Sequence, residues 1–147
     1  MTSGLWILLV VVVSATAFGV WRRLTDGRIR GVAASGPETP DDAGGDLLSA
    51  DDLGVALGGR ATLVQFSTAF CQPCRAARRT LAEVADMIPG VTHVEIDAEA
   101  HLDLVRRLDI MRTPTILVLD PAGRVTRRAV GAPRKADLIA ALGEVID

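Results

Sequence analysis

Both cysteines of this 147-residue chain lie three positions apart, at Cys71 and Cys74, in the stretch FCQPC. Two thiols at this spacing can form a local disulfide, act as a dithiol or supply half of a metal site. They are too few for the multi-bridge framework of a small secreted protein. The two cysteines are therefore the first candidate for a functional site. Which of these roles they have depends on the secondary structure that positions them.

An apolar run leads into the cysteines and a helical pattern leads out of them. Ala61–Ser67, with the sequence ATLVQFS, is typical of a buried strand. After the cysteines, apolar residues recur at helical spacing until Pro89 and Gly90, at positions Ala77, Leu81, Val84, Ala85 and Ile88. Cys71 is therefore expected at the N-terminus of a helix, where unpaired N–H groups stabilise an anion such as a thiolate.

That position gives the two cysteines different roles. Cys71 is expected to be the attacking thiol, with added positive potential if Arg75 and Arg78 lie near it. Cys74, one turn further into the helix, is expected to be shielded and to attack only the mixed disulfide formed at Cys71. Pro73 costs little at an early helical position, because its missing N–H would have been unpaired anyway. The spacing thus predicts thiol–disulfide exchange.

A zinc site is one alternative for the pair. His93 and His101 could supply two further ligands, but seven residues separate them, and the usual spacing is three to five. The pattern also places His93 on a strand and His101 among apolar residues of a helix. Two buried thiols without chemistry are a further alternative, but a proline between them at a helix start serves little packing purpose. We therefore predict no metal.

The rest of the chain alternates strands and helices. Val91–Asp97 and Thr115–Leu119 are expected as strands, with a short helix over Ala100–Leu108 between them. The turn Asp120–Gly123 leads into an alternating strand over residues 124–130 in hairpin register. A terminal amphipathic helix follows, with apolar positions at Leu138, Ile139, Leu142, Val145 and Ile146. This order implies an α/β fold with a central mixed sheet flanked by helices, whose first two strands are parallel with a right-handed crossover.

The first residues have a different composition. Gly4–Trp21 contains no charge, includes Trp6 near its start, and is followed by four arginines within nine residues. As a helix it would rise about 27 Å, close to the ~30 Å hydrocarbon thickness of a bilayer. The tryptophans suit the two interfaces and the arginines suit a cytoplasmic flank. A cleaved signal peptide is the alternative, since Ala15–Ala17 resembles a cleavage site, but no positive side chain precedes the apolar run.

We therefore predict three parts: a transmembrane anchor over residues 1–23, a flexible linker over 24–46 and one globular domain over 47–147. The linker prediction depends on Gly31–Asp46, which is rich in Gly, Pro, Ala and acidic residues and has no periodic apolar face. The arginines favour a single-pass anchor in the cell membrane with the domain in the cytoplasm, and an extracytoplasmic domain is the alternative.

A net charge of −2 and few aromatic residues give no indication of nucleic acid binding.

With these motifs, Leu47–Asp147 resembles the thioredoxin superfamily. The resemblance is carried by FCQPC, by RTPT around Pro114, by VEID before the second helix and by VGAPRK near the end. It implies a thioredoxin fold in which the Thr113–Pro114 bond is cis and packs beside a redox-active disulfide. It also implies that Thr113 offers its backbone to an extended substrate segment and that Gly131 forms the opposite lip of the groove.

The resemblance extends to individual site residues. It implies that Cys71 and Cys74 are catalytic and that the surface around them binds substrate, through Phe70, Gln72, Pro73, Thr113, Pro114 and Gly131. Phe70 stands where thioredoxins usually carry Trp, Gln72 where they carry Gly, and Arg79 where they have a helix-kinking proline.

Gln65 and Arg75 are the residues expected to tune the site. Gln65 stands where thioredoxins bury an acid that assists proton transfer from the second cysteine, and His93 stands where they place a lysine. Gln cannot act as a base. Water, Glu95 or a substrate group would then have to take this role. The alternative for Gln65 is a simple buried amide whose hydrogen bonds are satisfied.

The function implied is that of a membrane-tethered thiol–disulfide oxidoreductase that exchanges disulfides with partner proteins. Such a protein needs no bound cofactor beyond the redox-active Cys71–Cys74 disulfide, takes its redox equivalents from a partner protein and works as a monomer. The alternative is a non-catalytic adaptor of the same fold that binds a partner at the Pro114 groove.

Overall fold

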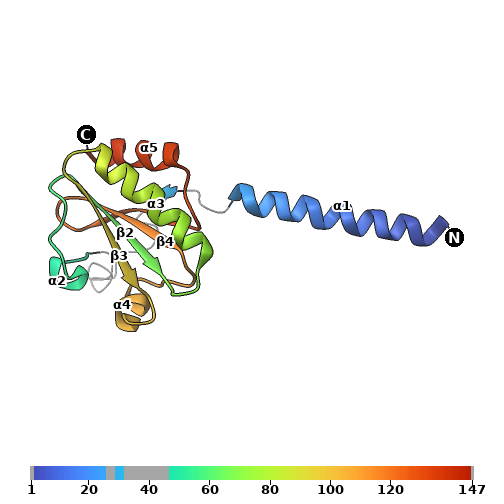
Figure 1. The fold of residues 1–147 in the computed structure, drawn as a ribbon, viewed down its shortest axis with the longest axis horizontal. Coiled ribbons are helices and arrows are strands. Elements are labelled where there is room, and N and C mark those ends of the chain that lie inside the picture. Colours follow the sequence, from blue (N-terminus) through green and yellow to red (C-terminus); the bar gives the residue numbers. More distant parts are fainter. Residues whose placement is uncertain (1, 26–28, 32–46, 147) are drawn as a thin grey trace, which may run out of the picture.

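The computed structural model describes residues 2–25, 29–31 and 47–146. It begins with the long helix α1 (Thr2–Thr25) (Figure 1). The other elements follow in the order β1 (Ile29–Gly31), α2 (Ala50–Leu53), β2 (Ala61–Ser67), α3 (Gln72–Met87), β3 (Val91–Asp97), α4 (Leu102–Arg107), β4 (Thr115–Leu119), β5 (Val125–Val130) and α5 (Lys135–Ile146).

The strands form one five-stranded sheet in the order β1-β5-β4-β2-β3. β2 and β3 are parallel, because helix α3 carries the chain back between them, and the other neighbours are antiparallel. β4 and β5 are joined by the turn after Leu119, which makes them the predicted hairpin. The predicted α/β fold with a central mixed sheet is therefore confirmed.

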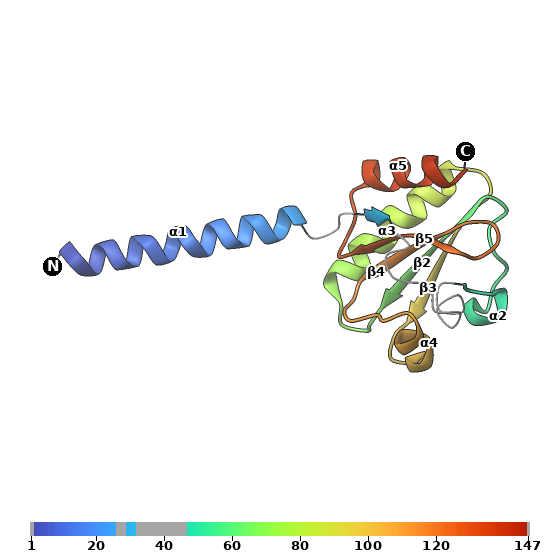
Figure 2. The same cartoon turned by 180° about the vertical axis from the view of Figure 1, so that it is seen from behind.

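Helices cover both faces of the sheet (Figure 2). On one face, α3 and α5 bury apolar side chains such as Leu81 and Leu138 against Leu63 of β2. On the other face, α4 and α2 pack against Val64 and Phe66. Successive side chains of a strand point to opposite faces, so β2 is buried on both sides along its full length. This explains why its sequence is a continuous apolar run.

Strand β1 differs from what the sequence predicts. Ile29–Gly31 falls inside the span 24–46 expected to be a flexible linker, yet it pairs with β5 as the edge strand of the sheet. Ile29 is half-buried and packs against the core under α3 and α5. Apolar burial and edge pairing outweigh the polar composition around it. The rest of that span, including residues 32–46, lies outside the described residues.

Helix α1 contains the apolar segment noted in the sequence. Gly4–Arg22 has a mean hydropathy of 2.2, and none of it is buried against the rest of the chain. Its length and composition fit a membrane span, and a signal sequence would have the same properties.

Candidate active site

The two cysteines form a disulfide at the N-terminus of α3. Cys71 is the N-cap residue of the helix, in an extended backbone conformation, and Pro73 lies in the first turn. The backbone N–H of Cys74 donates to Cys71 Sγ over 3.2 Å, and the Cα atoms of the two cysteines are 5.2 Å apart. Cys71 thus lies where the helix presents its unpaired N–H groups, as the sequence pattern predicts.

The two cysteines differ in their exposure. Cys71 is half-buried, whereas Cys74 is 2% exposed and belongs to the buried face of α3. A pocket of about 430 Å³ opens beside the pair and is lined by Ser67, Thr68, Ala69, Cys71, Cys74, Arg75, Arg78, Glu95 and Asp97. An incoming sulfur can therefore reach Cys71 more easily than Cys74.

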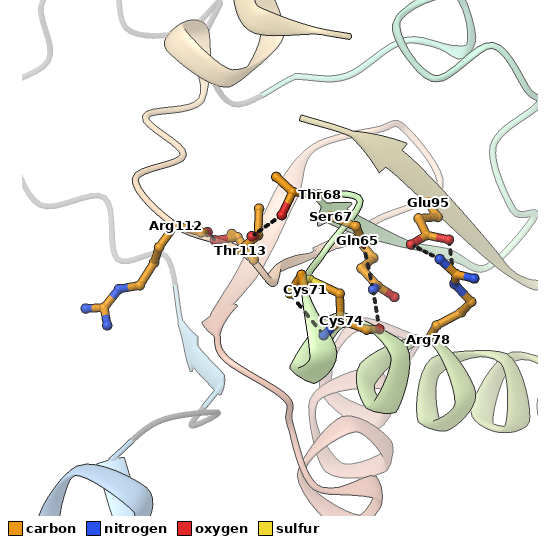
Figure 3. Close-up of a disulfide and its surroundings, with 10 residues drawn as sticks. Gln65, Ser67, Thr68, Cys71, Cys74, Arg78, Glu95, Arg112 and Thr113 are labelled. Atoms are coloured by element: carbon orange, nitrogen blue, oxygen red, sulfur yellow. Dashed lines mark hydrogen bonds and ion pairs between the residues drawn. A yellow bond between two sulfur atoms is a disulfide. The ribbon is translucent and has the colours of Figure 1, made fainter. Parts of the chain in front are cut away.

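The loop before β4 lies against the cysteine loop (Figure 3). The Thr113–Pro114 peptide bond is cis, as the resemblance implies. The hydroxyl groups of Thr113 and Thr68 are 3.2 Å apart, which joins this loop to the residues just before Cys71. On the other side of Pro114, the N–H of Gly131 donates to the Pro114 carbonyl over 2.8 Å. The structure thus places Thr113, Pro114 and Gly131 together, against the loop that leads into Cys71.

Two apolar side chains stand out into solvent around this site. Phe70, directly before Cys71, is 99% exposed, and Met111, just before the cis-proline loop, is 83% exposed. Gln72 and Pro73 are exposed as well. Phe70 is among the residues predicted from the sequence and Met111 is not, because a lone methionine in a loop carries no periodic signal. The directly adjoining RTPT motif could have drawn attention to it.

Gln65 supports the backbone of the second cysteine. Its side chain is fully buried, and Nε2 donates to the carbonyl oxygen of Cys74 and to Ser67 Oγ, both over 2.9 Å. Its Oε1 lies 3.3 Å from Nε2 of His93. These contacts satisfy the amide and match the alternative of a buried amide with its hydrogen bonds made.

The charged residues of the pocket are partly paired with one another. Arg78 contacts the Glu95 carboxylate with two nitrogen atoms, at 2.6 and 2.7 Å. Burial alone would raise the pKa of Glu95, but hydrogen bonds from Arg78 and Ser67 outweigh it and hold the pKa below its ordinary value. Arg75 lines the pocket from an exposed position. Of the two arginines considered from the sequence, Arg78 is therefore largely neutralised by its partner.

His93 interacts electrostatically with both members of this pair. Burial lowers its pKa, and the nearby Arg78 acts in the same direction, while the Glu95 carboxylate opposes them. The ring of His101 is directed elsewhere, with Nδ1 3.0 Å from the Asp97 carbonyl oxygen. Within the described part of the chain, no three His, Cys, Asp or Glu side chains gather in a way that could hold a metal ion.

Comparison with known proteins gives consistent matches to one family. The family model described as Thioredoxin matches residues 54–144. Thioredoxin H5 of Oryza sativa subsp. japonica is 32% identical over 65 residues, which cover 44% of this chain and 48% of that protein. Thioredoxin of Mycobacterium tuberculosis is 30% identical over 88 residues, which cover 59% of this chain and 75% of that protein.

A solved structure gives a similar picture. The crystal structure of chloroplastic thioredoxin z superposes with a TM-score of 0.57 and 29% identity, covering 68% of this chain and 92% of that one. Thioredoxin-2 of Pyricularia oryzae is 31% identical over 99 residues, 65% of this chain and 57% of that protein. The chain thus spans about half the length of Thioredoxin H5 and Thioredoxin-2.

Proposed function

Because this chain belongs to the thioredoxin family, we propose that it is a thiol–disulfide oxidoreductase, held at a membrane by α1, that exchanges disulfides with partner proteins. The observation that carries the proposal is the asymmetric disulfide at the start of α3. Its first cysteine is half-buried at the N-cap, and its second is 2% exposed in the first turn of the helix. A thioredoxin-family match over residues 54–144 supports the same chemistry.

The exchange begins from the reduced pair. The Cys71 thiolate attacks one sulfur of a substrate disulfide, the substrate S–S bond breaks, and one substrate thiolate leaves. The Cys74 thiolate then attacks Cys71 Sγ, which releases the second substrate thiolate and forms the Cys71–Cys74 disulfide. Two electrons have moved from the protein to the substrate. A partner protein supplies them again, so we propose no bound cofactor.

The helix N-terminus favours the first step. In the oxidised protein the Cys74 N–H already donates to Cys71 Sγ over 3.2 Å. In the reduced protein, the same donor and the partial positive charge at the start of α3 would stabilise a thiolate at Cys71 relative to the thiolate of a free cysteine in water. Exposed Arg75 adds positive potential from the rim of the pocket.

The groove beside the disulfide is proposed to bind the substrate chain. An extended substrate segment would align with the backbone of Thr113, with Gly131 at the opposite lip of the groove. The exposed residues Phe70, Gln72 and Pro73 would contact the segment beside the cysteines. We propose that the protein does this as a monomer.

A trapping experiment tests the proposed chemistry. In Cys74→Ala, Cys71 can still attack a substrate, but nothing resolves the mixed disulfide, so the substrate is expected to stay covalently attached. The adducts would be detected by non-reducing electrophoresis and mass spectrometry. The matched control is Cys71→Ala/Cys74→Ala, which should trap nothing.

The same pair of variants separates the enzyme from the adaptor. An adaptor that only binds a partner at the Pro114 groove should bind it without a reducible bond and equally well in both variants. That result would reject the oxidoreductase.

We propose further that the domain lies in the cytoplasm, on the side of the arginines that follow Trp21, and that it acts there as a reductase. The position is tested with Ser35→Cys, outside the described residues, in a Cys71→Ser/Cys74→Ser background. A membrane-impermeant thiol reagent should label it in lysed cells and not in intact cells. Labelling of intact cells would place the domain outside, where maturation of exported thiol proteins becomes the proposed role.

A further inference from the structure

The chain enters the domain at the end of the sheet that carries the disulfide. β1 is antiparallel to β5, with Ile29 opposite Ala129 and Gly31 opposite Arg127. β5 itself runs toward Gly131, which bonds to the Pro114 carbonyl beside the cysteines. The start of β1 therefore lies at the same end of the sheet as the cis-proline loop.

The register of the sheet shows how near this point is to the cysteines. Ile29 lies opposite Ala129, which lies opposite Ile116, which in turn lies opposite Gln65. Gln65 is the residue whose amide contacts Cys74. Three strand spacings of about 4.8 Å separate the ends of this row, or roughly 14 Å. The first residue of β1 is thus level with the residue that supports the disulfide.

The connection from α1 to this point is short. α1 ends at Thr25 and β1 begins at Ile29, and four peptide steps span at most about 14 Å even when fully extended. The Gly/Pro-rich segment expected as a tether follows β1 and so cannot lengthen this connection. Figures 1 and 2 agree in placing α1 on the side of the domain where β2 ends and α3 begins.

The surface at this end fits an apolar partner. Phe70 and Met111 are almost fully exposed and flank the cysteine loop and the cis-proline loop. The Thr68–Thr113 contact holds these two loops together. Removal of these two side chains from water would favour their contact with an apolar surface, such as the boundary of a bilayer.

We propose that the disulfide end of the domain faces the membrane and that its substrate is a disulfide in the juxtamembrane segment of an integral membrane protein. This inference depends on the proposed function and narrows its substrate class. A short tether keeps Cys71 near the bilayer, so its effective concentration is high around membrane-protein disulfides that lie close to the bilayer. Membrane-protein disulfides that project further than the tether allows Cys71 to reach would not react. The exchange itself follows the two steps given above.

The orientation can be measured on the full chain in lipid nanodiscs. In a Cys71→Ser/Cys74→Ser background, a fluorophore is attached either to Met111→Cys, at the disulfide end, or to Ala122→Cys, in the exposed β4–β5 turn at the opposite end. Paramagnetic lipid headgroups should quench the probe at position 111 more strongly. Equal or stronger quenching at position 122 would overturn the inference.

The substrate class is tested with the wild-type chain, reduced, in the same nanodiscs. The probe is a transmembrane peptide whose single cysteine carries thionitrobenzoate, either directly after the apolar segment or at the end of an extended polar segment. One thionitrobenzoate is released per turnover whichever sulfur Cys71 attacks. The near peptide is expected to react several-fold faster than the far peptide. A variant with a long Gly-Ser insertion after Thr25 should lose this preference.

Soluble insulin separates failure of the inference from failure of the proposed function. Wild-type and insertion variant should both reduce insulin disulfides. If insulin is reduced but the wild-type chain shows no preference for the near peptide, the inference is wrong and the proposed function stands. If neither insulin nor either peptide is reduced, the proposed function is wrong and the inference falls with it.

Discussion

The side-chain amide of Gln65 donates a hydrogen bond to the backbone carbonyl of Cys74 over 2.9 Å. The donor is fully buried in the central strand β2, and the acceptor lies in the first turn of α3. Together with the bond from the same nitrogen to Ser67, this contact ties the disulfide helix to the sheet beneath it. A neutral amide can hold this position through its hydrogen bonds but cannot act as a base.

Replacement of Gln65 is therefore expected to weaken the fold. Gln65→Leu has a similar volume but leaves the buried oxygen of Ser67 and the ring of His93 without this partner, at a cost of about 1–3 kcal/mol in the free energy of unfolding. Denaturant unfolding of the detergent-solubilised chain would measure it. The matched control is Gln72→Leu, an exposed amide, which should stay within about 0.5 kcal/mol of wild type. Equal effects of both substitutions would contradict the supporting role.

His93 should make stability depend on pH. Burial lowers its pKa in the folded protein below the ordinary value of 6.5, so the unfolded chain binds more protons just below pH 6.5. The contribution of neutral His93 to the free energy of unfolding is therefore fully present above pH 6.5. It is lost as the pH decreases through the pKa of His93 in the folded protein. Glu95 acts in a separate window, near and below its ordinary value of 4.5.

The measurement is the free energy of unfolding of wild type and His93→Gln between pH 7.5 and pH 5.5, a range of about one unit on either side of 6.5. The variant should lose most of the slope. The control His101→Gln retains His93 and should retain the slope with it. A slope that survives in His93→Gln would assign it to other groups.

Much of the sheet could be predicted from local pattern. β2, β3 and β4 have the predicted bounds, because each is a run of strand-forming residues closed by turn residues or by a change of period. The N-cap position of Cys71 was predictable for the same reason: the end of a strand, a proline and a helical stripe all lie within a few residues.

The missed features depend on contacts between distant residues. Strand β1 has three residues and no period, and it exists because the edge of β5 is available for pairing. The contact of Gln65 with Cys74 depends on how α3 crosses the sheet, which no local pattern determines. Helix α2 did have a local signal: Ser49 and Asp52 form a capping box. A helix of four residues is, however, too short for a periodic pattern.

Gly131 is expected to tolerate no side chain without cost. Its φ is +91°, a region that residues other than glycine rarely adopt, and its N–H must still reach the Pro114 carbonyl. Gly131→Ala should lower the free energy of unfolding by about 1–3 kcal/mol. Gly143→Ala is the matched control: it lies inside α5 with open space around its Cβ position. That substitution should stabilise the chain by about 0.5–1 kcal/mol, so the two changes are expected to have opposite signs.

Phe70 should contribute to substrate binding and not to folding. The side chain is 99% exposed beside Cys71, whereas Phe66, four residues earlier, is fully buried. Phe66→Ala is expected to cost about 3–5 kcal/mol in the free energy of unfolding, and Phe70→Ala less than about 0.5 kcal/mol. With a protein disulfide as substrate, Phe70→Ala should raise KM several-fold and leave kcat unchanged, because the lost apolar contact lies outside the reacting sulfurs. The rate with a small uncharged disulfide, hydroxyethyl disulfide, should match wild type. If that rate fell as far as the rate with protein substrates, Phe70 would act on the cysteines themselves and not on the substrate chain.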